Sequence, residues 1–239
     1  MEKLLGQLND KLQAAAGPNL RAIVLFGSAA RGEYHERHSD LNVLCVLKRA
    51  RAEDIEALHD AAVWWEQKKL PAPQIFTLDE LRASADIFAI ELLDMKTHHK
   101  MIYGEDFFDE LAVPMHLHRL QVERELRTNW VKLRQGILLA PQKEHVLMAL
   151  MDASVSTFVT LFRHALIALG VDPPVGRRDV VAEIARLSGG RPDAFLAVLD
   201  VREGKRQARD VKARETLREY LDLVERVTDE VDRRLADGE

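Results

Sequence analysis

The chain has 239 residues, 47% of them hydrophobic, which is enough for one large domain or two small ones with a substantial core. A formal net charge of −5 and a pI near 6.0 argue against a broad nucleic-acid-binding face, which would need clustered Lys and Arg. The single cysteine, Cys45, excludes an internal disulfide and a thiolate metal site, and its apolar surroundings predict a small core residue.

The first part of the chain alternates helical and strand patterns. We predict a helix over 2–16, a strand over 21–26, a helix start over 28–32 and a strand over 40–48. The elements that follow are a helix over 52–69, a strand over 74–78 and a helix over 79–93. Thr77 and Glu80 have the spacing of a capping box at the start of the last helix. We expect His98 and His99 to form a solvated helix end.

From residue 115 onward only helical patterns remain. The predicted helices cover 115–139, 143–169, 177–188, 192–202 and 207–236. Pro114 marks the boundary, so we predict one domain over 1–113 and a helical-bundle domain over 114–239.

The most apolar stretch of the sequence, 146–170, carries Asp152, Arg163 and His164. Charged side chains are costly inside a bilayer, so we expect a buried helix and no membrane span. The first eight residues alternate apolar and polar side chains and do not have the pattern of a signal peptide. We therefore expect a cytoplasmic protein.

The most informative motif lies between the first two predicted strands. The first strand runs into Gly27-Ser28, and the second opens with Ser39-Asp40. Gly27 lets the backbone approach an anion closely, and a helix beginning near Ser28 would direct its free N–H groups at a phosphate. Residues i and i+2 of a strand share a face, so Asp40 and Asn42 project together. Two carboxylates at that spacing could share a pair of magnesium ions about 4 Å apart.

This series of a strand, Gly-Ser, Arg-Gly, Ser-Asp and a second strand resembles the signature of the DNA polymerase beta-like nucleotidyltransferases. The resemblance implies an α+β fold, with a mixed sheet and flanking helices followed by an all-α helical bundle, as in the bacterial aminoglycoside nucleotidyltransferase-like proteins. It implies that Gly27, Ser28 and Arg31 bind the phosphates of a nucleoside triphosphate. It also implies that Asp40, the catalytic residue, and Asn42 hold magnesium while a nucleoside monophosphate passes to a hydroxyl acceptor.

Two amides stand where that family has acids. Asn42 replaces the second aspartate of the strand, and Gln74 stands on the next predicted strand about where a third acid is wanted. An amide oxygen can ligate magnesium but brings no charge. Three functions therefore stay open: a magnesium-dependent transferase, a catalytically degenerate nucleotide-binding or regulatory protein, and an antitoxin-like interaction module. The acceptor and the oligomeric state, a homodimer included, also stay open.

Several other polar side chains have a functional and a simpler interpretation. His35 and His38 could contact a phosphate or be ordinary loop residues. Glu91 and Asp94 could serve as replacement acids or lie on a solvated helix face. His116 and His118 point to different faces of a helix, so we expect no shared metal. A basic cluster near a helix junction could bind an anion or be a solvated loop; it consists of Arg202, Lys205, Arg206 and Arg209.

Overall fold

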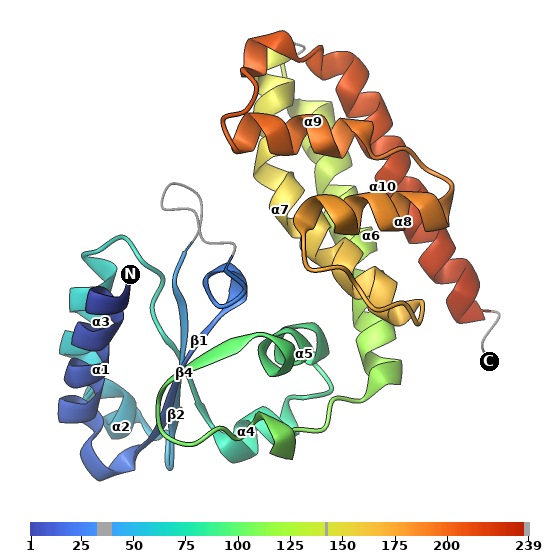
Figure 1. Ribbon diagram of the computed structural model, residues 1–239. Helices are drawn as coiled ribbons and strands as arrows, with labels where there is room; N and C mark the ends of the chain where they lie inside the picture. Colours follow the sequence, from blue (N-terminus) through green and yellow to red (C-terminus); the bar gives the residue numbers. More distant parts are fainter. Residues whose placement is uncertain (33–39, 142, 237–239) are drawn as a thin grey trace. The chain divides into compact units, whose positions relative to one another are not determined.

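The computed structural model describes residues 1–32, 40–141 and 143–236. The chain divides into two compact units, Met1–Pro114 and Met115–Glu239, and each is described by itself. The first unit is a small sheet with helices on both faces, and the second is a bundle of helices (Figure 1). The predicted α+β class, with a mixed sheet followed by an all-α bundle, is confirmed.

A four-stranded mixed sheet forms the centre of the first unit. Its strands are β1 (Leu20–Phe26), β2 (Asn42–Leu47), β3 (Gln74–Thr77) and β4 (His99–Tyr103). They lie in the order β3-β2-β1-β4, with β1 antiparallel to both β2 and β4, and β2 parallel to β3. The buried apolar side chains of β1 and β2 alternate between two core clusters, one on each face.

Helices cover both faces of this sheet (Figure 1). On one face lie α1 (Glu2–Ala16), α2 (Ala52–Glu56) and α3 (His59–Glu66). Leu41, Val43 and the fully buried Cys45 point to this face. On the other face lie α4 (Leu78–Ala83) and α5 (Ala89–Thr97), which pack on Leu44 and Val46. Burial raises the pKa of the Cys45 thiol to about 12, which excludes a reactive thiolate.

Three predicted elements of this unit differ from the structure. The helix expected over 52–69 is broken into α2 and α3. The helix expected over 79–93 is α4 and α5, separated by a turn, although the capping box of Thr77 and Glu80 is confirmed at the start of α4. The helix end expected at His98 and His99 is confirmed for His98, which is the C-cap residue of α5, and is wrong for His99, which begins β4 and pairs with β1. There the His99 ring bonds the carbonyl of Met95 at 2.8 Å.

The second unit is built from five α-helices in the described part of the chain. They are α6 (Met115–Leu139), α7 (Glu144–Ala168), α8 (Arg177–Ser188), α9 (Asp193–Arg202) and α10 (Ala213–Ala236). Phe195 of α9 stacks on the buried ring of Tyr220 of α10, with centroids 3.9 Å apart. By length and composition α7 is apolar enough to cross a membrane, with a mean hydropathy of 1.5 in its most apolar window. Its buried side chains pack within the bundle, as those of a core helix do.

Candidate functional site

The Gly-Ser motif forms a tight turn directly after β1. Gly27 has a φ of +76°, a conformation that favours glycine, and it begins the 3-10 turn Gly27–Ala29. The N–H groups of Ala30 and Arg31 both donate to the carbonyl of Gly27, at 3.1 and 3.2 Å. The predicted helix start over 28–32 is therefore a single short turn in the described part of the chain. The first N–H groups of such a turn, including that of Ser28, have no acceptor inside it.

The Ser-Asp motif meets this turn because Phe26, the last residue of β1, pairs with Asn42, the first residue of β2. Leu41 is buried in the core, whereas Asp40 is exposed and Asn42 is half-buried. Alternation along β2 places Asn42 on the same face as Leu44, the face that α4 and α5 cover. A Cβ added to Gly27 would lie 2.9 Å from Nδ2 of Asn42, so this amide packs directly against the turn. The structure thus brings Gly27 and Asn42 together as the motif predicts.

Gln74, at the position where a third acid was wanted, is exposed at the start of β3. It pairs with Leu44 in the parallel ladder, so it shares a sheet face with Asn42 and lies about 7 Å further along. Among the described residues, no three His, Cys, Asp or Glu side chains form a group that could hold a metal ion. In the described part of the chain the donors at these positions are one carboxylate and two amides, which do not fit two magnesium ions, although Asp40 could ligate one that a nucleotide brings.

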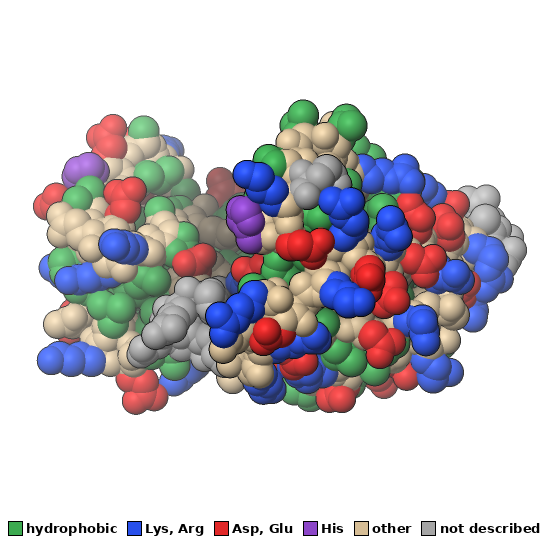
Figure 2. All heavy atoms as spheres, turned by 90° about the horizontal axis from the view of Figure 1, so that it is seen from above, with side chains coloured by type: hydrophobic (Ala, Val, Ile, Leu, Met, Phe, Trp, Pro, Cys, Tyr) green, Lys and Arg blue, Asp and Glu red, His purple; other side chains and the backbone are tan. Residues whose placement is uncertain are grey.

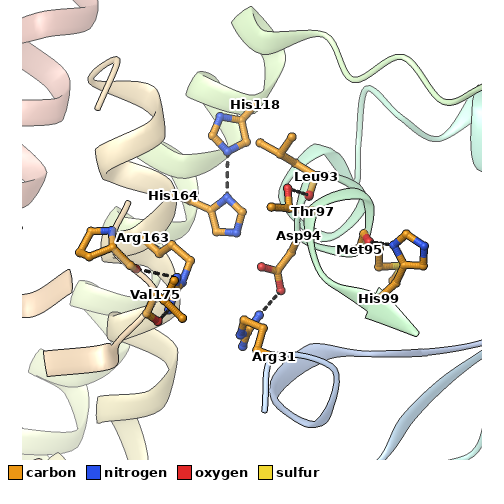
Figure 3. A network of polar contacts seen from close by, with 11 residues as sticks. Arg31, Leu93, Asp94, Met95, Thr97, His99, His118, Arg163, His164 and Val175 are labelled. Atoms are coloured by element: carbon orange, nitrogen blue, oxygen red, sulfur yellow. Dashed lines mark hydrogen bonds and ion pairs between the residues drawn. The ribbon is translucent and has the colours of Figure 1, made fainter. Parts of the chain in front are cut away.

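Arg31 does not extend into solvent from the turn. Its Nη1 lies 2.5 Å from Oδ2 of Asp94 on α5, and the two side chains are only 8% and 16% exposed (Figure 3). Asp94 is thus not on a solvated helix face, which corrects the simpler interpretation of that residue. The ion pair fastens the Gly27–Arg31 segment to α5. A phosphate contact by Arg31 stays a prediction, and a phosphate there would share the guanidinium with Asp94.

Other candidate residues lie apart from this turn or outside the description. Ser39, His35 and His38 fall outside the described residues. His116 is exposed, whereas His118 is buried on α6, where its Nε2 lies 3.0 Å from Nδ1 of His164 on α7 (Figure 3). Burial, followed by the charge of Arg119, lowers the pKa of His118 to about 4.

In the basic cluster of the second unit, Arg202 and Lys205 have acidic partners, Asp152 and Glu203. Arg202 bonds the carbonyl of Asp152 at 3.0 Å, Lys205 pairs with Glu203 at 2.7 Å, and Arg206 donates to a carbonyl. On the face shown in Figure 2, basic and acidic side chains are interleaved and do not gather into one basic patch. The ion pairs of Arg202 and Lys205 favour a solvated loop over an anion site at this cluster.

The comparisons with known proteins agree with the geometry of the first unit. Residues 1–94 match the family model of the nucleotidyltransferase domain. The fold is similar to that of the spectinomycin adenyltransferase AAD(9) from Enterococcus faecialis, solved with ATP and spectinomycin. The TM-score is 0.56 at 15% identity, over 94% of this chain and 99% of that one. None of the curated proteins matches the chain.

A second solved structure is similar to part of the chain only. It is a toxin–antitoxin assembly with AMP-PNP, 22% identical over 44% of this chain and 77% of that one. Its TM-score of 0.31 is too low to support an argument about the fold or the function.

Proposed function

Since residues 1–94 form a nucleotidyltransferase domain of the DNA polymerase beta-like superfamily, we propose that this protein binds a nucleoside triphosphate and transfers its nucleoside monophosphate to a hydroxyl acceptor. The observation that carries the proposal is the meeting of two motifs. Gly27, which has a positive φ, begins the turn that follows β1, and the last residue of β1 pairs with Asn42, the first residue of β2. The exposed Asp40 lies two residues before Asn42 in the chain. A glycine turn and an acid thus lie at the end of the sheet where β1 ends and β2 begins.

Each residue at this end of β1 and β2 has a defined task in the proposal. Gly27 lets a phosphate approach the backbone, and the N–H and hydroxyl of Ser28 donate to its oxygens. Asp40 is the carboxylate ligand for a magnesium ion carried by the triphosphate. Such an ion, when bound, neutralises the charge of the phosphates. In the transfer, the acceptor oxygen bonds to the α-phosphorus, pyrophosphate leaves, and the hydroxyl proton passes to solvent.

The similar spectinomycin adenyltransferase was solved with ATP and spectinomycin. That structure supports ATP as the nucleotide to try first and a small polyhydroxylated molecule as the class of acceptor. The adenyltransferase is only 15% identical to this chain, so the acceptor is proposed as a class and not as one compound.

A second candidate function is a nucleotide-binding protein that does not turn the nucleotide over. The two amides, Asn42 and Gln74, favour it, as does the lack of a three-ligand metal group among the described residues. Both candidates require triphosphate binding at the same turn. They differ only in whether the nucleoside monophosphate is transferred to an acceptor.

Two measurements test the proposal. A triphosphate should raise the melting temperature, because ligand that binds only the folded state stabilises it, and Ser28→Trp should abolish this shift by filling the turn. With a triphosphate labelled on the α-phosphate and a panel of acceptors, Asp40→Asn should lower transfer by at least about a hundredfold. Asp60→Asn, an exposed acid on α3, is the matched control and should leave the rate unchanged.

The outcomes separate the candidates. No thermal shift with any triphosphate would refute a nucleotide site of either kind. A shift without transfer would support the non-catalytic binder. Equal transfer by the natural protein and by Asp40→Asn would show that the catalytic acid lies elsewhere.

A further inference from the structure

We propose that Asn42 is a phosphate-binding residue and not a metal ligand, so that triphosphate binding at the Gly27 turn does not depend on magnesium. The inference rests on the proposed nucleotide site and says how that site holds its ligand. It concerns the binding step only.

The first observation is the direction of the Asn42 amide. Nδ2 is the atom nearest to the place where a Cβ of Gly27 would stand, at 2.9 Å, with Cγ at 3.9 Å and the oxygen of the amide beyond 4 Å. The nitrogen end of the amide therefore faces the turn. A side-chain amide nitrogen donates two hydrogen bonds, whereas a metal requires the oxygen. This orientation suits a phosphate oxygen resting on the turn.

The second observation is the charge at the end of the sheet where β1 ends and β2 begins. A carboxylate at position 42 would repel a triphosphate unless a cation lay between the two groups. Asn42 removes that charge, and Gln74 on the neighbouring strand adds none. Asp40, which is exposed to solvent, is the acid that the motif retains. A triphosphate bound here therefore has less need of a bridging dication than one bound at a site with acids at all three positions.

The third observation is that the partners of the phosphate are already held in place. The turn is closed by two hydrogen bonds to the carbonyl of Gly27, and the ion pair of Arg31 with Asp94 fastens it to α5. Asn42 is the first residue of β2 and pairs with Phe26. A rigid set of N–H donors binds an anion without the ordering that a metal would otherwise provide.

Calorimetric titration of the full chain with AMP-PNP, in magnesium and separately in EDTA, tests the inference. For the natural protein the two dissociation constants should agree within about threefold. Asn42→Asp keeps the size of the side chain and restores the charge, so its affinity in EDTA should fall at least about tenfold and recover in magnesium. Asn9→Asp adds the same charge on α1, where Asn9 accepts a bond from Gln13, and should behave as the natural protein.

Each outcome has one meaning. A natural protein that loses about tenfold or more in EDTA overturns the inference and leaves the proposed function standing. An Asn42→Asp variant that melts normally but binds equally in both conditions also overturns it, because position 42 would then not touch the phosphates. Absence of binding in both conditions refutes the nucleotide site itself, and the inference with it.

Discussion

The ion pair of Arg31 with Asp94 allows a quantitative prediction about the candidate site. Asp94→Asn keeps the shape of the side chain but removes the negative charge that faces the guanidinium of Arg31 in a mostly buried place. Loss of one partner of a fully buried pair costs about 3–5 kcal/mol, and exposed pairs contribute little. With side-chain exposures of 8% and 16%, we expect the first unit to lose about 2–3 kcal/mol of unfolding free energy.

The assay follows unfolding of the first unit alone. Trp64 and Trp65 lie in that unit and Trp130 lies in the other, so a Trp130→Phe background makes tryptophan fluorescence report on the first unit. Urea titration should then show a lower midpoint for Asp94→Asn with an unchanged slope. Asp79→Asn is the matched control, because its side chain is 92% exposed beside Arg82, and its midpoint should not move.

A double-mutant cycle decides whether the pair itself is responsible. Arg31→Met combined with Asp94→Asn removes both charges, so the double variant should be clearly more stable than the sum of the two single losses implies. If the two losses add, or if Asp94→Asn alone keeps the natural midpoint, the two side chains are not coupled. The account of how α5 holds the turn would then be wrong.

Two further predictions concern the packing of each unit. Gly104→Ala should destabilise the first unit by at least about 2 kcal/mol, because the added Cβ would lie 2.2 Å from the carbonyl oxygen of Arg21. Urea titration measures this loss, and Gly17→Ala, whose Cβ meets nothing within 4 Å, is the control. Equal losses in the two variants would contradict the steric reason. Because the folded pKa of His118, about 4, lies below the ordinary 6.5, the second unit should keep its full stability above pH 6.5 and lose up to about 3 kcal/mol as the pH falls to 4. Hydrogen exchange of α6 and α7 measures this loss, and His118→Asn should flatten it.

Much of the fold can be predicted because its signals are local. The capping box of Thr77 and Glu80 spans three residues, and the change from alternating elements to helices alone is visible in the hydrophobic period. Elements with weak periodicity are missed. The strand β4 has the polar His99 and Lys100 at its start and lies at an edge of the sheet, so its sequence alone does not distinguish it from a helix end.

The sequence by itself determined the family of the first unit, because Gly27, Ser28 and Asp40 lie within a few residues of one turn and two strands. It also determined that amides stand at positions 42 and 74. Only the tertiary structure decided which way the Asn42 amide faces and that Asp94 holds Arg31, 63 residues away in the chain. A contact over such a separation depends on the packing of α5 on the sheet, and no local pattern of residues records that packing.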